Sequence, residues 1–410
     1  MEKYFNLPKN HNPEMINFRF CIAFTLLTLV AGQLTGFAQR LQGLDGTVVA
    51  HQPASTKKYI GSPSLAILPN GAYVASHDFF GPESSEWVQA VTHIYQSGDK
   101  GKSWQRLAEI DGAFWSKLFV HRNILYLIGP DRHHGTLLIR KSEDGGKTWT
   151  KPVNRENGLL LAGEFHCAPT PVIEYNNRLW RAMETAHGPV RQWGRRYGTF
   201  MMSAPVDADL LRADSWRSSN MLQFDSTYLD GKFTGWLEGN AVVAPDSGIV
   251  NILRVDDKTT LEEKAAIVRI DREGKKASFD PSTGFLPFPG GSKKFTIRYD
   301  PVSGTYWSLV NYIPSDIKAL YPGKNPATIR NTMALAISRD LKSWDILKVL
   351  LQHPDVEKHG FQYVDWQFEG EDIIWLCRTA AEDGIGGARN NHDANFLTFH
   401  RIKAFRKLLK

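Results

Sequence analysis

The sequence predicts an all-β protein with the architecture of a β-propeller. Helical periodicity is hard to find in the 410 residues, and short alternating or apolar runs separated by Gly, Pro, Asn and Asp recur instead. The pattern Ser-x-Asp-x-Gly-x-Ser/Thr-Trp occurs twice, at 97–104 and at 142–149. Its two tryptophans, Trp104 and Trp149, are 45 residues apart. Self-similarity at about 40–50 residues is typical of propellers and similar arrays.

The repeated pattern is a turn with a structural role. We expect Asp99 and Asp144 to fold their carboxylates onto nearby backbone N–H groups, while each tryptophan anchors its hairpin in the core. The pattern resembles the Asp-box, or bacterial-neuraminidase repeat, of the sialidase superfamily. A form one residue shorter ends in Trp344. We therefore predict a β-propeller with six to seven blades that carry Asp-box turns.

Six repeated units can be laid out along the chain, each with an apolar strand, a turn, a second strand and a later third strand. They span residues 62–110, 115–153, 166–216, 236–279, 294–344 and 361–402. The stretch 40–60 is expected to pair with the last blade and close the ring, which removes the exposed sheet edges. No linker or low-complexity segment divides the rest, so residues 39–410 are interpreted as one propeller domain.

The N-terminus has the pattern of a secretory signal peptide over 1–38, with 1–14 as a possible upstream extension. Arg19 precedes an apolar run at 20–30, and small residues stand before a cut after Ala38. The run is too short for a membrane span, although a retained anchor is the alternative. The sequence thus predicts a periplasmic or secreted protein.

The formal charge is +6 and its basic residues are scattered, so nucleic acid is not an expected partner. The mild excess suits an anionic partner but does not demand one. Beyond the signal, the only cysteines are Cys167 and Cys377, which we predict to be two buried free thiols. No metal or cofactor pattern stands out: His133 and His134 are adjacent and would point to opposite faces of a strand.

Polar residues gather where each blade's innermost strand begins and where its second strand ends. In a propeller these points lie on one face, and the Asp-box turns lie on the other. His166 is a candidate catalytic base there. The candidate substrate-binding residues are His77, Asp78, Arg181, Glu238, Asn240, Arg254, Tyr312, Asp365, Arg378 and His392.

The same positions argue against a sialidase. Enzymes of that superfamily carry an arginine at the start of the first blade to hold the sialate carboxylate. Here Gly61 stands in its place, and the arginine expected after the second strand is replaced by Ser76, His77 and Asp78.

Several strings together resemble glycoside hydrolase family 145, propeller proteins of Bacteroidetes: 59–65, 75–82, 235–240, 294–300, 360–366 and 392–401. The resemblance covers most of the chain in order. It implies a seven-bladed exo-α-L-rhamnosidase that removes rhamnose linked α-1,4 to glucuronic acid, as on arabinogalactan side chains. It also implies a site on the face opposite the usual propeller pocket, with one catalytic histidine near the N-terminus. The nearest match is His51, with Gln52 beside it.

Two further functions stay open. Related propeller lyases act on uronate polysaccharides from the usual face, pairing a His or Tyr with an Arg that neutralises the carboxylate. His77, His166, Arg181, Arg254 and Tyr312 could supply that set. A propeller that binds a plant or algal acidic glycan without turnover is the other alternative.

Overall fold

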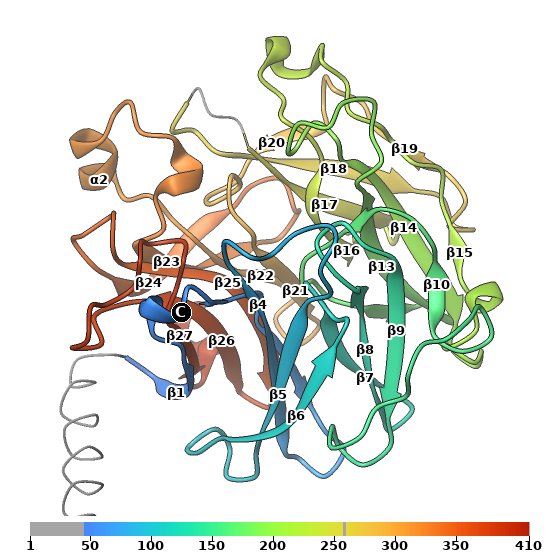
Figure 1. Ribbon diagram of the computed structural model, residues 1–410. Coiled ribbons are helices and arrows are strands. Elements are labelled where there is room, and N and C mark those ends of the chain that lie inside the picture. The colour runs from blue at the N-terminus through green and yellow to red at the C-terminus, as the bar shows by residue number, and fades with distance from the viewer. Residues whose placement is uncertain (1–44, 257–259, 410) are drawn as a thin grey trace, which may run out of the picture. The chain divides into compact units, whose positions relative to one another are not determined.

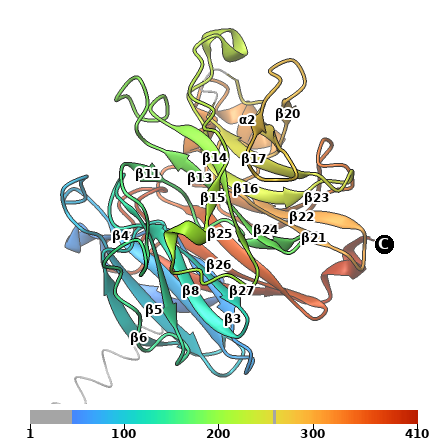
Figure 2. The ribbon, with the colours of Figure 1, turned by 90° about the vertical axis from the view of Figure 1, so that its right-hand side faces the viewer.

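Six antiparallel sheets of four or five strands make up the part of the chain that the structure describes, residues 45–256 and 260–409 (Figures 1 and 2). The structure is a computed structural model. The prediction of a propeller is confirmed, with six blades. The predicted signal peptide, 1–38, lies outside the described residues.

The first three blades follow one another along the chain. Blade 1 consists of β2 (Tyr59–Ile60), β3 (Ser64–Ile67), β4 (Tyr73–Phe80), β5 (Val91–Ser97) and β6 (Gln105–Asp111). Blade 2 consists of β7 (Lys117–His121), β8 (Ile124–Pro130), β9 (Leu137–Ser142) and β10 (Leu159–Leu161). Blade 3 consists of β11 (Phe165–His166), β12 (Ile173–Tyr175), β13 (Arg178–Thr185), β14 (Gly198–Pro205) and β15 (Arg217–Ser218).

The last three blades complete the ring. Blade 4 consists of β16 (Leu237–Val243), β17 (Ile249–Val255), β18 (Lys264–Ile270), β19 (Ala277–Ser278) and β20 (Phe285–Pro287). Blade 5 consists of β21 (Thr296–Asp300), β22 (Thr305–Val310), β23 (Thr332–Ser338) and β24 (Asp345–Gln352). Blade 6 consists of β25 (Gly360–Glu369), β26 (Asp372–Ala380), β27 (Phe396–Ile402) and β1 (Thr47–His51).

The predicted ring closure is confirmed, because β1 pairs antiparallel with β27 as the outermost strand of blade 6. Tight turns join the strands within a blade: Asn176 and Asn177, both in the left-handed region, join β12 to β13. Helical segments are short and lie in connections. They are α2 (Ser315–Leu320) and the 3₁₀ helices η1 (Ala54–Thr56), η2 (Ala213–Ser215), η3 (Tyr228–Gly231), η4 (Pro326–Thr328) and η5 (Phe405–Leu409).

The hydrophobic core lies between the blades. Each of the six largest apolar clusters of the described residues joins two neighbouring sheets, including one between blades 6 and 1 that contains Leu65 and Leu376. Both surfaces of a blade are therefore buried, which explains why strands such as β17 are apolar at consecutive positions. Cys167 and Cys377 are free and buried, as predicted. No helix within the described ranges is both long and apolar enough to span a membrane.

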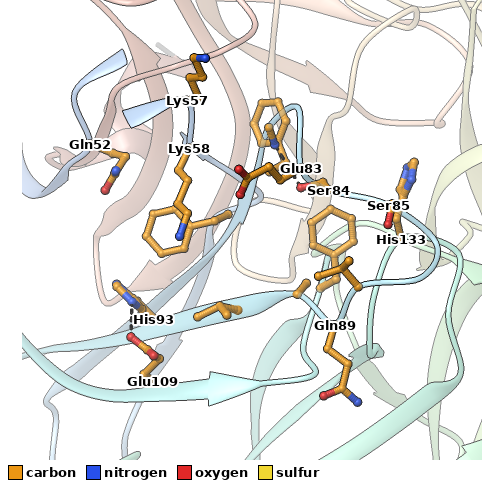
Figure 3. Close-up of a pocket in the computed structure, with 17 residues that line it drawn as sticks. Gln52, Lys57, Lys58, Glu83, Ser84, Ser85, Gln89, His93, Glu109 and His133 are labelled. Carbon is orange, nitrogen blue, oxygen red and sulfur yellow. Dashed lines mark hydrogen bonds and ion pairs between the residues drawn. The ribbon is translucent and has the colours of Figure 1, made fainter. Parts of the chain in front are cut away.

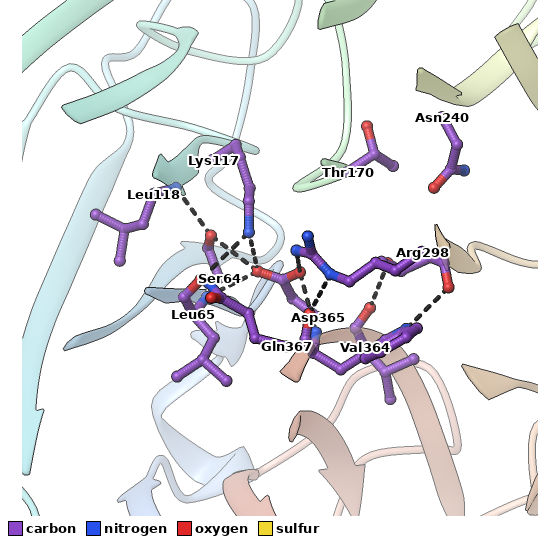
Figure 4. A network of polar contacts seen from close by, with 12 residues as sticks. Ser64, Leu65, Lys117, Leu118, Thr170, Asn240, Arg298, Val364, Asp365 and Gln367 are labelled. Atoms are coloured by element: carbon purple, nitrogen blue, oxygen red, sulfur yellow. Dashed lines mark hydrogen bonds and ion pairs between the residues drawn. The ribbon is translucent and has the colours of Figure 1, made fainter. Parts of the chain in front are cut away.

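A buried polar cluster on the axis ties four blades together (Figure 4). The Asp365 carboxylate of β25 accepts hydrogen bonds from the Leu65 backbone N–H at 2.8 Å and from the Ser64 hydroxyl at 3.2 Å. It also pairs with Lys117 of β7 and lies 3.6 Å from the guanidinium of Arg298 in β21. Innermost strands of blades 1, 2, 5 and 6 thus meet at one carboxylate.

We name the two faces of the ring by their contents. The pocket face is the side on which innermost strands begin and second strands end. The turn face carries the two repeated Asp turns, which follow β5 and β9. In the second turn the Asp144 carboxylate accepts from the Thr148 N–H at 2.9 Å, the Thr148 hydroxyl at 2.7 Å and the Ser142 hydroxyl at 2.8 Å.

These hydrogen bonds lower the pKa of Asp144 to about 2, the Thr148 hydroxyl contributing most. Because the folded-state pKa is below the unfolded value, the turn is stabilised above about pH 4 and loses this contribution as the pH falls toward 2. We expect Asp144→Asn to lower the free energy of unfolding by at most about 1 kcal/mol at neutral pH, since the carboxylate is exposed. The difference in free energy of unfolding between wild type and Asp144→Asn should become smaller as the pH falls. Thermal unfolding across pH measures it, with the exposed Asp207→Asn as control; a pH-independent deficit would contradict the account.

Candidate active site

A pocket of about 390 Å³ opens near the axis on the pocket face and receives side chains from five blades and their connecting loops. Its lining residues are Gly61, Ser62, Asp78, Phe80, Gly81, Ser84, Phe114, Trp115, His133, His166, Trp193, Glu238, Tyr363, Arg378 and His392. We call it the central pocket. It brings together five of the predicted site residues: Asp78, His166, Glu238, Arg378 and His392.

Three of the lining residues have backbones in the left-handed region: Trp115 with φ 45°, Glu238 with φ 53° and Tyr363 with φ 55°. This region costs a residue with a side chain about 1–2 kcal/mol. Glu238 and Tyr363 lie where the register of β16 and β25 shifts against the neighbouring strand, so each is the extra residue of a β-bulge. The bulges re-aim both side chains into the pocket, and strain of this kind collects at functional sites.

Guanidinium groups are the dominant charges beside Tyr363. The guanidinium of Arg378 lies 4.7 Å from the centre of the Tyr363 ring, and that of Arg330 lies 5.7 Å from it. Arg330 donates to the Gln362 side chain at 2.7 Å, and Arg378 donates through Nε to the His392 carbonyl at 3.1 Å. Both side chains are buried, and within the described residues neither has an acidic ion-pair partner.

Arg254 differs from these two arginines because it has such a partner. Its Nη1 lies 3.1 Å from each carboxylate oxygen of Glu238. Burial by itself raises the pKa of Glu238, but Arg254 and His166 outweigh it, and the net shift is downward. Burial lowers the pKa of Arg378 to about 10, so its side chain keeps its charge at neutral pH. Among these groups Arg254 and Glu238 form an ion pair, and the positive charges of Arg330 and Arg378 lie beside Tyr363.

Asp78 is the second carboxyl group of the pocket. Desolvation by burial raises its pKa to about 6 against the opposing effect of hydrogen bonds from the backbone N–H groups of Trp115, at 2.5 Å, and Ser62. A Cβ atom on Gly61 would lie 1.8 Å from the Asp78 carboxylate. Only glycine fits there, which gives a physical reason for the absence of an arginine at this position.

Two histidines flank these groups. His166 Nδ1 lies 3.0 Å from Glu184, whose other oxygen accepts from the Gly239 N–H at 2.9 Å. The His166 ring is stacked on Tyr197 at 4.4 Å. Burial, reinforced by Arg378, lowers the pKa of His392 to about 3, so its ring is neutral at physiological pH.

The other predicted residues lie outside the central pocket, although Arg254 reaches its edge through Glu238. His77 points between the blades, stacked on Tyr95, because neighbours in β4 alternate and Asp78 takes the pocket side. Asn240 is fully buried and hydrogen-bonded to the Ile297 N–H and to three carbonyl oxygens, linking blades 4 and 5.

Arg181 is fully buried and donates to the carbonyl oxygens of Ala168 and Thr170, which fixes that loop. Asp365 lies in the axial cluster. Tyr312 lines a separate cavity with Phe288 and Trp344.

His51 ends β1, opposite Phe396, with Nε2 3.0 Å from Asp383. Since β27 begins on the pocket face, His51 lies on the same side as the central pocket, whereas the resemblance implies a site on the opposite side. It stands at the outer strand of its blade, away from Glu238 and Tyr363.

Tyr363 and Arg330 are functional candidates that the sequence did not reveal. Regular alternation would place Gln362 and Asp365, three positions apart, on opposite faces of β25, and the bulge at Tyr363 breaks that alternation. Arg330 precedes the third strand of blade 5, away from the strand ends at which site residues were sought. Among the described stretches, no group of three or more His, Cys, Asp or Glu side chains is placed to hold a metal ion.

No family model and no curated protein matches the chain. Solved structures with the same fold do match. An α-L-arabinanase of Penicillium chrysogenum in complex with arabinobiose is 14% identical with a TM-score of 0.53, over 88% of this chain and 98% of its own. A Fusarium graminearum α-L-arabinofuranosidase with an iminosugar inhibitor is 11% identical with a TM-score of 0.54, over 89% and 99%. A Trypanosoma rangeli sialidase in complex with sialic acid is 15% identical with a TM-score of 0.52, over 86% and 55%.

The chain has the six-bladed propeller fold. At these identities the likeness establishes the fold alone, so the chemistry must be argued from the pocket.

We expect Asp78 to exchange its proton near pH 6. Because the folded-state pKa is above the unfolded value, wild-type protein loses stability as the pH rises through this range. The Asn side chain of Asp78→Asn cannot titrate. The unfolding free energy of the variant minus that of wild type should therefore increase by about 2–3 kcal/mol from about pH 4 to pH 7. Denaturant titrations at each pH measure this difference. Parallel pH profiles for the two proteins would contradict the burial argument.

Proposed function

We propose that the protein is a glycoside hydrolase that acts in the central pocket on a glycan bearing a carboxylate. The observation that carries this proposal is the pair of buried guanidinium groups, Arg330 and Arg378, which flank Tyr363 without an acidic partner among the described residues. Arg378 lines the central pocket together with two carboxyl groups, Asp78 and Glu238, whereas Arg330 lies beside the Tyr363 ring and is not among the lining residues. Proteins of the same fold named as arabinanase, arabinofuranosidase and sialidase support the reaction class.

Electrostatics favour an anionic ligand. A buried cation without a counter-charge costs free energy, which a ligand carboxylate placed between Arg330 and Arg378 would offset. Guanidinium groups suit this task because their planar forks match the geometry of a carboxylate. Glu238 already neutralises Arg254, so the unmatched positive charge lies on the Tyr363 side of the pocket.

Asp78 is the general acid in this proposal. A carboxyl group with a pKa of about 6 is protonated in weakly acidic solution, up to about pH 6, and can then deliver its proton to the leaving oxygen. Tyr363 is the nucleophile, and Glu238 accepts its proton as the Tyr363 oxygen bonds to the sugar. A water molecule that Asp78 then deprotonates breaks this bond and releases the sugar. Glycosidases with a tyrosine nucleophile are a known exception to the use of two carboxyl groups, so a phenol can take this role.

The specific substrate that we propose is rhamnose linked α-1,4 to glucuronic acid, on an acidic plant or algal polysaccharide. It rests on the sequence resemblance and on the fit of a uronate carboxylate to Arg330 and Arg378. In this proposal His166 helps to orient Glu238 and is not the nucleophile, and His51 lies outside the reacting centre. The periplasmic or secreted location remains part of the proposal and rests on the signal sequence. A sialoside is the comparison substrate, because sialic acid also carries a carboxylate.

The first test is a panel of rhamnosyl-α-1,4-glucuronate, the same disaccharide with its carboxyl group reduced, a sialoside and an arabinofuranoside. We expect release of rhamnose from the first, with kcat lower by about 10²–10⁴ in Asp78→Asn, Tyr363→Phe and Glu238→Gln. The exposed Tyr299→Phe is the matched control for Tyr363. If only the sialoside is cleaved, the proposed substrate is wrong and the proposed site stands. If a glycan binds and no sugar is released, the protein is a glycan-binding protein and not a hydrolase.

The second test concerns the carboxylate. Arg330→Met and Arg378→Met should each lower kcat/KM for the acidic substrate by about 10²-fold, because each removes a charge-assisted contact. On the substrate whose carboxyl group is reduced, each variant should have the same kcat/KM as wild type, because this substrate lacks the group that the arginines bind. The exposed Arg272→Met should behave as wild type. Equal losses on both substrates would mean that the arginines serve the structure and not recognition.

A uronate lyase is the second candidate, favoured by one grouping. The neutral His392 ring lies beside Arg378 and 6.3 Å from the Tyr363 ring, so a base, a hydroxyl and a carboxylate-neutralising cation are close together. A base that removes the proton next to a neutralised carboxylate performs β-elimination. An unsaturated product that absorbs ultraviolet light, formed in place of free rhamnose, would select this function.

A further inference from the structure

A second cavity of about 420 Å³ lies on the pocket face at blade 1, directly beside the central pocket (Figure 3). We call it the side pocket. Phe80, Gly81, Ser84, Phe114 and His133 line both cavities, so the two share one wall. The side pocket is completed by Gln52, Lys57, Lys58, Phe79, Glu83, Ser85, Val88, Gln89, Ala90, Val91, His93 and Glu109.

The shared wall is thin and fixed in place. At Gly81 the chain approaches a neighbouring segment so closely that a Cβ atom would lie 2.2 Å from the Lys57 carbonyl oxygen. The loop that follows is anchored by Glu86, whose carboxylate lies 2.6 Å from His134 Nδ1 and whose carbonyl accepts from Arg132 at 2.8 Å. Because the same five residues border both cavities, a chain of sugars that leaves the central pocket beside Phe80 would enter the side pocket.

The chemistry of the side pocket differs from that of the central pocket. Two lysines, Lys57 and Lys58, are balanced by Glu83 and Glu109, and His93 is paired with Glu109 at 2.8 Å. Amide and hydroxyl groups of two glutamines and two serines add further polar contacts (Figure 3), and most of the remaining lining is apolar. A balanced set of donors and acceptors suits an uncharged ligand rich in hydroxyl groups, as a neutral sugar is.

An aromatic surface completes the resemblance to a sugar site. The Phe79 ring makes edge-to-face contacts with His77 at 4.8 Å and with His93 at 4.7 Å, which fix its orientation in the side pocket. Burial lowers the pKa of His77 to about 3, so this contact is with a neutral ring. Phenyl rings held in this way offer an apolar surface to the C–H groups of a sugar.

We infer that the side pocket is a second subsite, which binds the neutral sugar on the reducing side of the carboxylated sugar. The inference rests on the proposed function. Its direction follows from blade 1: Asp78, the proposed general acid, and Phe79 and Phe80 are consecutive in β4. The acid must contact the leaving oxygen, so the leaving part of the glycan extends from Asp78 over Phe80 into the side pocket. The protein thus reads an acidic sugar and a neutral neighbour together.

Two variants test the subsite without touching the central pocket: Phe79→Ala, which removes the aromatic surface, and Ser85→Trp, which fills the cavity. For whichever acidic glycan the panel shows to be cleaved, we expect KM to rise about tenfold for the oligosaccharide that carries a neutral sugar on the reducing side. KM should change less than about twofold for the methylumbelliferyl glycoside of the same acidic unit, and kcat should be unchanged. The exposed Val302→Ala is the control for a remote apolar substitution.

A second readout needs no turnover. Saturation-transfer NMR with lactose, a neutral probe, should show contact in wild-type protein and in Asp78→Asn, and lose it in Phe79→Ala and Ser85→Trp. Equal KM values in all proteins, or a lactose signal that survives both substitutions, would overturn the subsite even if the hydrolase is real. If no glycan is cleaved, the proposed function fails, and the lactose signal alone then decides whether the side pocket binds sugar.

Discussion

The Asp365 carboxylate is the contact on which the rest of the ring depends. It joins the innermost strands of four blades at the axis, and its partners come from three distant parts of the chain. Removing one partner of a buried ion pair typically costs about 3–5 kcal/mol, because an unpaired charge remains in a low dielectric. Asp365 also fixes the end of the bulge at Tyr363, which lies two residues earlier in β25. The axial cluster and the candidate site therefore share one strand.

The pocket is built from conformations that a strand does not normally adopt. The left-handed backbones of Glu238 and Tyr363 each carry a cost, and they persist because packed strands hold both sides of each bulge. These conformations direct the Glu238 carboxylate and the Tyr363 phenol into a space lined by Arg378 and Asp78. Rigid sheets position these groups more precisely than loops could, which suits a site that must hold an anion in a fixed place.

Much of the fold follows from local pattern. The 45-residue spacing of Trp104 and Trp149 and the turn residues between apolar runs predict the blades and the closing strand, since each turn and each period acts locally. The rule that residues at the start of innermost strands and at the end of second strands lie on one face also brings Asp78, Glu238 and Arg378 into one pocket. It fails at His77, because only one of two neighbours in β4 can face the axis, and it misses Tyr363, because a bulge reverses the alternation on which the rule depends.

The pairing of β1 with β27 has a consequence for how the protein is made. Val48 pairs with Thr398, so β1, the first described strand, cannot pair until β27 has been synthesised. At ordinary translation speeds that wait is roughly 20–70 s. During this time the growing chain exposes the edge of an unfinished ring, and such edges pair readily with other strands. A nascent chain of this architecture therefore needs protection longest at its N-terminal end, and truncation at the C-terminus should harm folding far more than its length suggests.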